Sequence, residues 1–325
     1  MKQIALNTPV TAPAIPKHIR IRYGSPMISL GSCFSDTMAK KLYHLGYDIL
    51  VNPFGTLYNP LSIARALEML SIAETSLSED ELYCKGDKWV SLMHHSRFCS
   101  KQKEDLLQTI NSLLRLGHQR LQTAHWLLIT LGTSFAYKWR ASQEIVANCH
   151  KLPAHLFDLH ECSLEEMEKA MLGALQPILT HNKQLRILLT VSPIRYMNYG
   201  AHESALSKAR LLLLTRTIER HFPERITYFP AYEIMMDELR DYRYYADDML
   251  HPSPLAEEFI FHRLCQSMLL EEEEKIRSAA LKLRQLAMHR SNDIRKHQAL
   301  IVEWTEKYKN LFPSPKALTQ TMEID

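Results

Sequence analysis

The stretch Pro26-Met-Ile-Ser-Leu-Gly-Ser-Cys-Phe-Ser-Asp36 organises the interpretation of the whole chain. A short apolar run, Met27 to Leu30, breaks at Gly31-Ser32, and apolar residues at helical spacing follow it. A buried strand that turns directly into a helix leaves the Ser32 hydroxyl at the carboxyl edge of a sheet, beside the free N–H groups of a helix start. Because open α/β sheets build their sites at that edge, Ser32 is the first candidate functional residue.

Similar apolar runs recur along the chain and alternate with helical patterns. The expected strands are 27–30, 48–51, 125–131, 186–191 and 226–229, and the expected helices are 37–45, 61–72, 104–123, 163–181 and 203–220. This alternation predicts a parallel sheet covered by helices on both faces, joined by right-handed crossovers. Residues 135–147 predict a hairpin and residues 74–104 a loop or short hairpin, and we expect no second set of strands.

The ends of the chain differ from its middle. Residues 1–22 are rich in proline and basic residues and predict an extended lead-in, whereas the chain is almost wholly helical after about Ser253. We therefore expect an α/β domain over residues 1–255 and a helical extension over 256–325 packed on the same domain. The extension either covers the cleft or mediates a homodimer, and the pattern leaves both open.

Composition narrows the class of protein. The 325 residues are 46% hydrophobic and 23% charged, as in an ordinary soluble protein. The net charge is +3, and the 39 basic and 36 acidic residues are interspersed, so no nucleic-acid-binding stripe is expected. No apolar run approaches the ~18 residues of a membrane span. The first ten residues lack the apolar core of a secretory signal, which favours a cytoplasmic and most simply bacterial setting.

The residues Asp248-Met-Leu-His251 offer the chemistry that a serine nucleophile needs. Such a serine requires a base for its proton, a carboxylate that orients the base, and N–H donors for the oxyanion. An aspartate three residues before a histidine, on a turn held by Pro252 and Pro254, can supply the base and its orienter together.

Three alternatives stay open at this stage. Cys33 is a rival nucleophile, although a position just inside the helix should direct it toward the core. Asp247 is a rival orienter. A phosphate-binding turn at Ser32 is a third reading, but no Walker pattern accompanies it.

The segment Gly31-Ser-Cys-Phe-Ser35 resembles the signature of the GSCFA family, a branch of the SGNH (GDSL-like) hydrolases. That signature usually has alanine where this chain has Ser35. The resemblance covers about residues 8–255, and its other blocks are Asn52–Pro60, His94–Phe98, Thr130–Thr133, Asn148–Lys151, Ser192–Arg195 and Ser207-Lys208.

The resemblance implies a flavodoxin-like three-layer α/β/α fold with strand order 2-1-3-4-5. It also implies that Ser32 is the nucleophile, His251 the base and Asp248 its orienter. The oxyanion donors would be the N–H groups of Ser32 and Gly55 and a side chain from the superfamily's third block, which in this chain begins at Thr130 and contains Gly132. The superfamily has an asparagine two positions after this glycine, where this chain has Ser134. The candidate replacements are therefore Thr133, Ser134 and Asn148. His95 and His150 are candidates for the substrate cleft.

The expected activity is a serine-dependent hydrolysis, through an acyl-enzyme, of an O-acylated carbohydrate, chiefly an acetylated one, or a similar small ester. An O-acyltransferase with the same triad and a non-catalytic carbohydrate- or ligand-binding protein are the alternatives. We expect no cofactor. His150, His155 and His160 recur every five residues, which does not align them on one helix face, so we also expect no metal site. Arg195 and Lys208 can bind a substrate anion or have surface roles.

Overall fold

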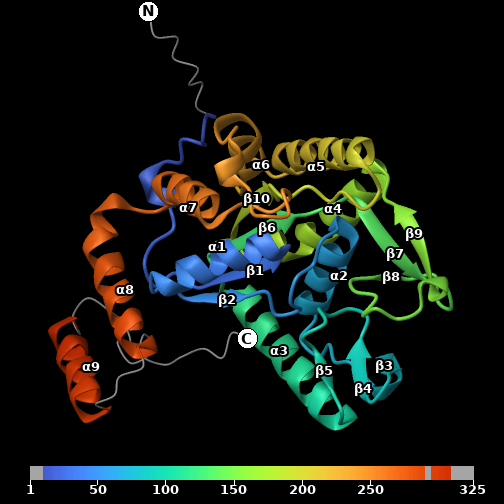
Figure 1. The fold of residues 1–325 in the computed structure, drawn as a ribbon, viewed down its shortest axis with the longest axis horizontal. Helices are drawn as coiled ribbons and strands as arrows, with labels where there is room; N and C mark the ends of the chain where they lie inside the picture. Colours follow the sequence, from blue (N-terminus) through green and yellow to red (C-terminus); the bar gives the residue numbers. More distant parts are fainter. Residues whose placement is uncertain (1–9, 290–293, 309–325) are drawn as a thin grey trace, which may run out of the picture.

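Five parallel strands form the central sheet (Figure 1). They are β1 (Met27–Gly31), β2 (Ile49–Val51), β6 (Trp126–Leu131), β10 (Arg186–Val191) and β11 (Ile226–Tyr228). The computed structural model describes residues 10–289 and 294–308. The sheet order is β11-β10-β6-β1-β2, which is 2-1-3-4-5 when only these five strands are counted, as the resemblance implied. Parallel pairing brings the carboxyl ends of all five strands to one edge.

Helices cover both faces of this sheet and produce three layers. Alternate residues of β1 belong to two different hydrophobic cores, Ile28 and Leu30 to one and Met27 to the other. The first core is closed by α2 (Pro60–Ser71), α3 (Lys103–Thr123), α4 (Leu164–His181) and α5 (Ala201–His221). The second is closed by α1 (Cys33–His44), α6 (Ala231–Glu233) and α7 (Pro254–Met268). The α/β class and its helical layers are therefore confirmed.

Two small antiparallel sheets correct the expectation of a single set of strands. One consists of β3 (Leu82–Lys85), β4 (Lys88–Ser91) and β5 (Cys99–Ser100), and the other has the order β8-β7-β9. The second contains β7 (Phe135–Trp139), β8 (Ile145–Val146) and β9 (Phe157–Glu161). The sequence does not predict β9 because this strand has five residues, of which only Phe157 is buried. It therefore lacks the continuous apolar run of the central strands.

The C-terminal helices divide into two groups. Helix α7 shares its buried face with the core of α1 and β1, so the expected boundary at residue 255 passes through a helix of the α/β layer. Helix α8 (Glu274–Met288) packs on α1, where the Arg284 guanidinium lies 3.5 Å from the centre of the Tyr43 ring. Helix α9 (Ile294–Tyr308) packs on α8, and both lie at one end of the molecule (Figure 1). Residues 1–9 of the expected lead-in, and residues 290–293 and 309–325 of the extension, lie outside the described residues.

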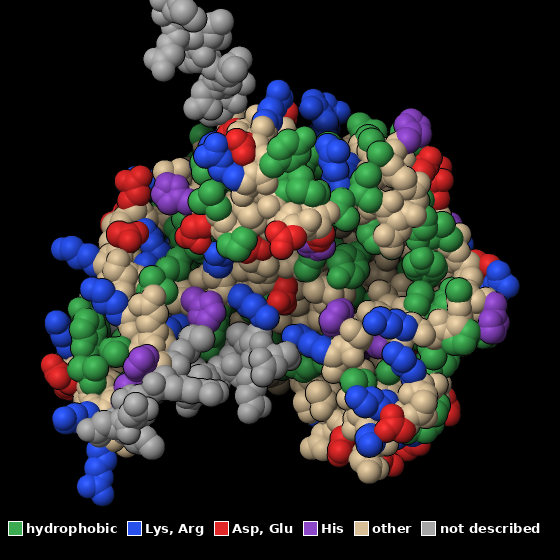
Figure 2. Space-filling view, viewed as in Figure 1, with side chains coloured by type: hydrophobic (Ala, Val, Ile, Leu, Met, Phe, Trp, Pro, Cys, Tyr) green, Lys and Arg blue, Asp and Glu red, His purple; other side chains and the backbone are tan. Residues whose placement is uncertain are grey.

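Within residues 10–289 and 294–308, no helix is both long and apolar enough to cross a membrane. Figure 2 shows lysine and arginine side chains interspersed with aspartate and glutamate on the face in view.

Candidate active site

A cavity of about 270 Å³ opens at the carboxyl edge of the central sheet. The turn between β1 and α1 contributes Ser32 and Cys33, and the segment after β6 contributes Gly132 and Thr133. Tyr58, most of the loop from Ser192 to Asn198, and the pair Leu250 and His251 complete its walls. Segments far apart in the sequence therefore meet where the parallel strands end.

The Ser32 hydroxyl has no structural role that the described residues reveal. Ser32 is the N-cap of α1, but its side chain does not cap the helix, although an N-cap serine ordinarily accepts a hydrogen bond from the first turn. The residue is 1% exposed, and its Oγ has no hydrogen-bond partner among the described residues. Leaving a buried hydroxyl unpaired costs about 1–3 kcal/mol. A group kept at that cost beside a cavity is a candidate reactive group.

Gly31 allows the sheet to place Ser32 where it lies. Its φ of +147° is a conformation that residues with a side chain rarely adopt, and a Cβ there would lie 2.4 Å from the carbonyl oxygen of Thr130. The next N–H group, that of Ser32, donates to the same carbonyl oxygen at 3.2 Å. The close approach of β1 to β6 at this point therefore requires glycine.

Asp248 and His251 form a preassembled pair. One carboxylate oxygen of Asp248 accepts the backbone N–H groups of Leu250 and His251, each at 2.9 Å, and the other lies 2.5 Å from His251 Nδ1. The N–H groups of His251 and Leu250, with the imidazole, lower the pKa of Asp248 to about 2. An ionised carboxylate at Nδ1 selects the tautomer that carries its proton there, so Nε2 is left as the acceptor. Asp248, not Asp247, holds the imidazole.

Ser32 and His251 line the same cavity without a hydrogen bond between them in the described structure. Hydrogen bonds between catalytic groups are often long or poorly aligned in apo structures and tighten when the substrate binds.

Cys33 corrects one expectation. It lines the cavity and is partly exposed, because α1 begins at Cys33 itself and its first residue projects toward the sheet edge. Burial raises the pKa of the Cys33 thiol, so near neutral pH it stays protonated and is a weak nucleophile.

The expected oxyanion donors already have acceptors. The N–H of Gly55 donates to the carbonyl of Asn52 at 2.7 Å, as the N–H of Ser32 does to Thr130. Thr133 lines the cavity, and its hydroxyl lies 3.2 Å from Ser207 Oγ. Ser134 is fully buried, does not line the cavity, and its Oγ has no partner among the described residues.

The remaining predicted site residues anchor loops instead of lining the cavity. His150 Nε2 lies 2.8 Å and 3.0 Å from the carbonyl oxygens of Ser91 and His94. The backbone N–H of His150 donates to Asn148 Oδ1 at 2.7 Å. His95 donates its N–H to the carbonyl of Phe54 at 2.9 Å. The structure does not bring Asn148, His150, His95 or Gly55 to the cavity wall, and their contact with a substrate stays a prediction.

Lys208 connects two of the segments that line the cavity. Its ammonium is fully buried and donates to the carbonyl oxygens of Gly132 at 2.7 Å and Ser192 at 2.8 Å, which joins the ends of β6 and β10. Burial lowers the pKa of Lys208 to about 7. A buried group that spans two carbonyls is a support for the cavity and not a contact for a substrate anion. The signal in the sequence was its place among the buried positions of α5, near Ser204 and Leu211.

Comparison with known proteins decides the family. The GSCFA family profile matches residues 26–264, about three quarters of the chain. The chain belongs to the GSCFA family. The match contains the Ser32 turn, the third block and the Asp248–His251 pair. No curated protein matches the GSCFA chain.

Two solved structures resemble this GSCFA protein distantly. One is a family two carbohydrate esterase from Clostridium thermocellum in complex with cellohexaose, with 8% identity and a TM-score of 0.37 over 79% of this chain. The other is an acetyl xylan esterase from the rumen bacterium Butyrivibrio proteoclasticus, with 9% identity and a TM-score of 0.37 over 76% of this chain. The GSCFA chain spans 66% and 64% of their lengths.

Proposed function

We propose that this GSCFA protein is a serine-dependent ester hydrolase that works through an acyl-enzyme. One observation carries the proposal: the buried Ser32 hydroxyl has no hydrogen-bond partner among the described residues and borders the same cavity as His251. The ionised Asp248 carboxylate contacts Nδ1 of this histidine, which leaves Nε2 as the acceptor. These are the three components of serine acyl transfer, in the chain order Ser, Asp, His.

The reaction follows from the protonation states of these groups. His251 Nε2 accepts the Ser32 proton as Oγ attacks the acyl carbonyl, and Asp248 stabilises the imidazolium that forms. The tetrahedral intermediate collapses when His251 returns the proton to the leaving alcohol, which leaves an acyl group on Ser32. Water, deprotonated by His251, then attacks this ester, and Ser32 regains its proton as the acid departs. An acceptor alcohol in place of this water would make the same triad an acyltransferase.

The oxyanion requires donors at the rim of the cavity. The N–H of Cys33 lies in the first turn of α1, where N–H groups have no intrahelical acceptor and favour negative charge. The Thr133 hydroxyl, on the segment after β6, is the third-block side chain that reaches the cavity wall. We assign these two groups to the oxyanion, with the Ser32 and Gly55 N–H groups contributing where they release their present carbonyl acceptors.

The shape and lining of the cavity favour a small, partly polar ester. Its volume of about 270 Å³ is near the lower limit of ordinary small-molecule pockets, about 300 Å³. Tyr58 and Tyr196 offer aromatic surface, and Arg195 and Asn198 offer hydrogen-bond donors. An O-acetylated carbohydrate fits this combination and is the substrate class that we propose.

A non-catalytic ligand-binding protein is the second candidate. The observations that favour it are the occupied N–H groups of Ser32 and Gly55 and the missing hydrogen bond between Ser32 and His251. Under this alternative, the cavity binds the carbohydrate and the triad does not turn over.

A fluorophosphonate probe, which labels activated serines covalently, separates these candidates. We expect the wild type and Cys33→Ala to be labelled, and Ser32→Ala and His251→Ala to lose labelling while keeping their circular dichroism spectra. A folded wild type that takes no label would reject the hydrolase and favour the binding protein. A labelled wild type is then assayed for release of acetate from acetylated sugars.

A further inference from the structure

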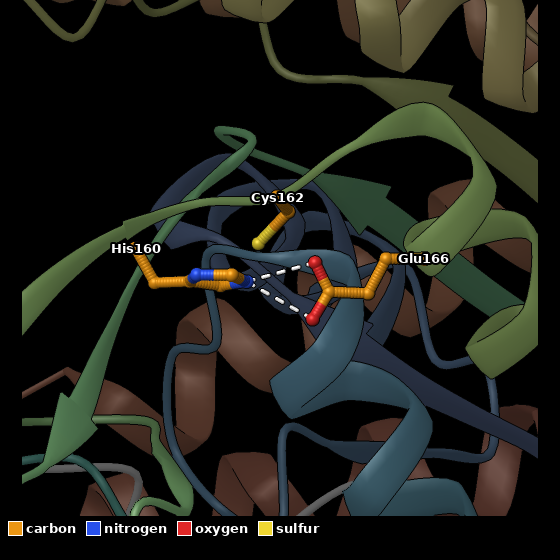
Figure 3. Close-up of side chains that lie close together, drawn as sticks. All are labelled: His160, Cys162 and Glu166. Carbon is orange, nitrogen blue, oxygen red and sulfur yellow. Dashed lines mark hydrogen bonds and ion pairs between the residues drawn. The ribbon is translucent and has the colours of Figure 1, made fainter.

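Three side chains outside the active site converge at the junction of β9 and α4. They are His160 on β9, Cys162 just after it and Glu166 in the first turn of α4 (Figure 3). One ligand atom from each lies within 4.8 Å of the other two. The His160 Nε2 is 2.7 Å and 2.9 Å from the two carboxylate oxygens of Glu166. None of the three residues lines the active-site cavity.

We propose that His160, Cys162 and Glu166 form a binding site for Zn²⁺. Imidazole nitrogen, thiolate sulfur and carboxylate oxygen are the three ligand types that zinc uses in proteins. A thiolate and an imidazole together disfavour Mg²⁺ and Ca²⁺, which select oxygen ligands. With the thiol and the carboxyl ionised and the imidazole neutral, the ligands carry two negative charges, which balance the charge of the cation.

The local fold explains why these side chains point to one place. Residues two apart near the end of a strand project from the same face, which pairs His160 with Cys162. The chain then turns at Ser163, the N-cap of α4, whose Oγ accepts the N–H of Glu166 at 3.1 Å. A glutamate at this third helical position commonly returns to the N-cap N–H. Here its carboxylate is directed at His160 instead.

The buried thiol is the second reason to read this cluster as a metal site. Cys162 is fully buried, and its Sγ makes no hydrogen bond among the described residues. Its backbone is fixed, because its N–H donates to the carbonyl of Ser134 at 2.9 Å. In Figure 3 the sulfur points toward the space that the imidazole and the carboxylate share. An ordinary His–Glu ion pair does not account for the direction of the thiol.

The three ligands would rearrange by about 1 Å to accept the metal, and Cys162 Sγ, which lies within 4.8 Å of the other two ligand atoms, would approach them by up to about 1.3 Å. Zinc lies about 2.3 Å from sulfur and about 2.0–2.1 Å from nitrogen or oxygen, so tetrahedral ligands are about 3.3–3.6 Å apart. The metal would replace the proton between His160 and Glu166, and their separation would widen by less than about 1 Å. His160 and Glu166 are partly exposed, at 23% and 37% of their side chains, so an ion and a fourth, water ligand can enter.

Bound zinc would brace the part of the chain that builds the third block. It would join β9 to the start of α4, and Cys162 is already bonded to Ser134, next to the cavity residue Thr133. The proposed site is structural and does not depend on the esterase activity.

Titration of the metal-free, tag-free full chain with Zn²⁺ and with Co²⁺ tests the proposal. We expect one equivalent to bind, a sulfur-to-cobalt charge-transfer band, and a rise in Tm with Zn²⁺. Cys162→Ser should abolish the band, and His160→Gln and Glu166→Gln should each weaken binding by at least about tenfold. The control Cys84→Ser removes an exposed thiol on β3 and should change nothing.

Two results would overturn the site. One is the absence of stoichiometric binding to the folded wild type. The other is binding that survives in Cys162→Ser with an unchanged dissociation constant and charge-transfer band, because the metal would then be held elsewhere. Circular dichroism of each metal-free variant identifies any that fails to fold, and the Zn²⁺-dependent rise in Tm of the wild type then decides alone.

Discussion

Replacement of Gly31 by alanine tests how the Ser32 turn is built. A Cβ at this position would lie 2.4 Å, 2.8 Å and 3.0 Å from the O, N and C atoms of Thr130, all of them backbone atoms that cannot rotate away. Residue 31 also has a φ of +147°, which a side chain disfavours. The strained conformation costs about 1–3 kcal/mol, and overpacking costs about 1–3 kcal/mol more. We therefore expect Gly31→Ala to lower the free energy of unfolding by roughly 2–6 kcal/mol, a large part of the total for a typical domain.

Two other glycines are matched controls. Gly86 also has a positive φ, +62°, but a Cβ there meets nothing within 4 Å, so Gly86→Ala should show the backbone cost alone, about 1 kcal/mol. Gly173 lies inside α4 with open space around it, and Gly173→Ala should stabilise by about 0.5–1 kcal/mol.

Urea unfolding followed by far-ultraviolet circular dichroism measures all three variants. Equal losses in Gly31→Ala and Gly86→Ala would refute the argument, because the close contact with Thr130 would then contribute nothing. If Gly31→Ala folds, its fluorophosphonate labelling should also be slower than that of Gly86→Ala, since the displaced strand carries Ser32 with it.

Two further predictions concern ionisable groups. Asp248→Asn should slow fluorophosphonate labelling by roughly 10²–10⁴-fold, because the amide no longer fixes the proton on His251 Nδ1. Asp247→Asn should leave labelling unchanged, and an equal loss in both variants would contradict the assignment. Burial lowers the pKa of His94 from 6.5 to about 3 in the folded protein. As the pH falls, this histidine is therefore protonated in the unfolded chain before it is protonated in the folded one. Stability should fall as pH decreases from about 6.5 toward 3, by up to about 1.4 kcal/mol per pH unit, and His94→Gln should flatten this dependence in urea titrations; superimposable curves would disprove it.

The sequence predicted the parts of the site that depend on topology. An apolar strand followed by Gly31-Ser32 places a hydroxyl at the carboxyl edge in any parallel sheet, and the spacing Asp248-x-x-His251 joins its two members through local hydrogen bonds. Both features depend on short stretches of chain. The order of the five central strands also follows from this pattern once the family resemblance is added.

The parts that were missed depend on distances between segments. The side chain of Cys33 lines the cavity because α1 begins at Cys33, four residues before the helix start at residue 37 that the apolar spacing predicts. Whether the N–H groups of Ser32 and Gly55 are free depends on the positions of two carbonyls, which no residue pattern encodes. The loop containing Tyr196 and Asn198 forms a wall of the cavity without any regular signal.

The proposed metal ligands show a different kind of omission. In the sequence, His160 belongs to a five-residue repeat with His150 and His155, whereas in the structure it is grouped with Cys162 and Glu166. A strand end, a helix cap at Ser163 and the spacing His-x-Cys-x-x-x-Glu together contain the signal. It becomes visible only when β9 is recognised as a strand.

The compact bonding of the Asp248–His251 turn has a consequence for how the protein would lose activity. The Asp248 carboxylate is fixed by two N–H groups from its own turn, so Asp248 and His251 move together as one rigid unit. Warming or mild denaturant should therefore separate this unit from Ser32 before it disrupts the unit itself. Inactivation would then be a reversible displacement of this turn from Ser32, and cooling would restore activity. In the inactive state, NMR should still detect the proton between His251 Nδ1 and Asp248.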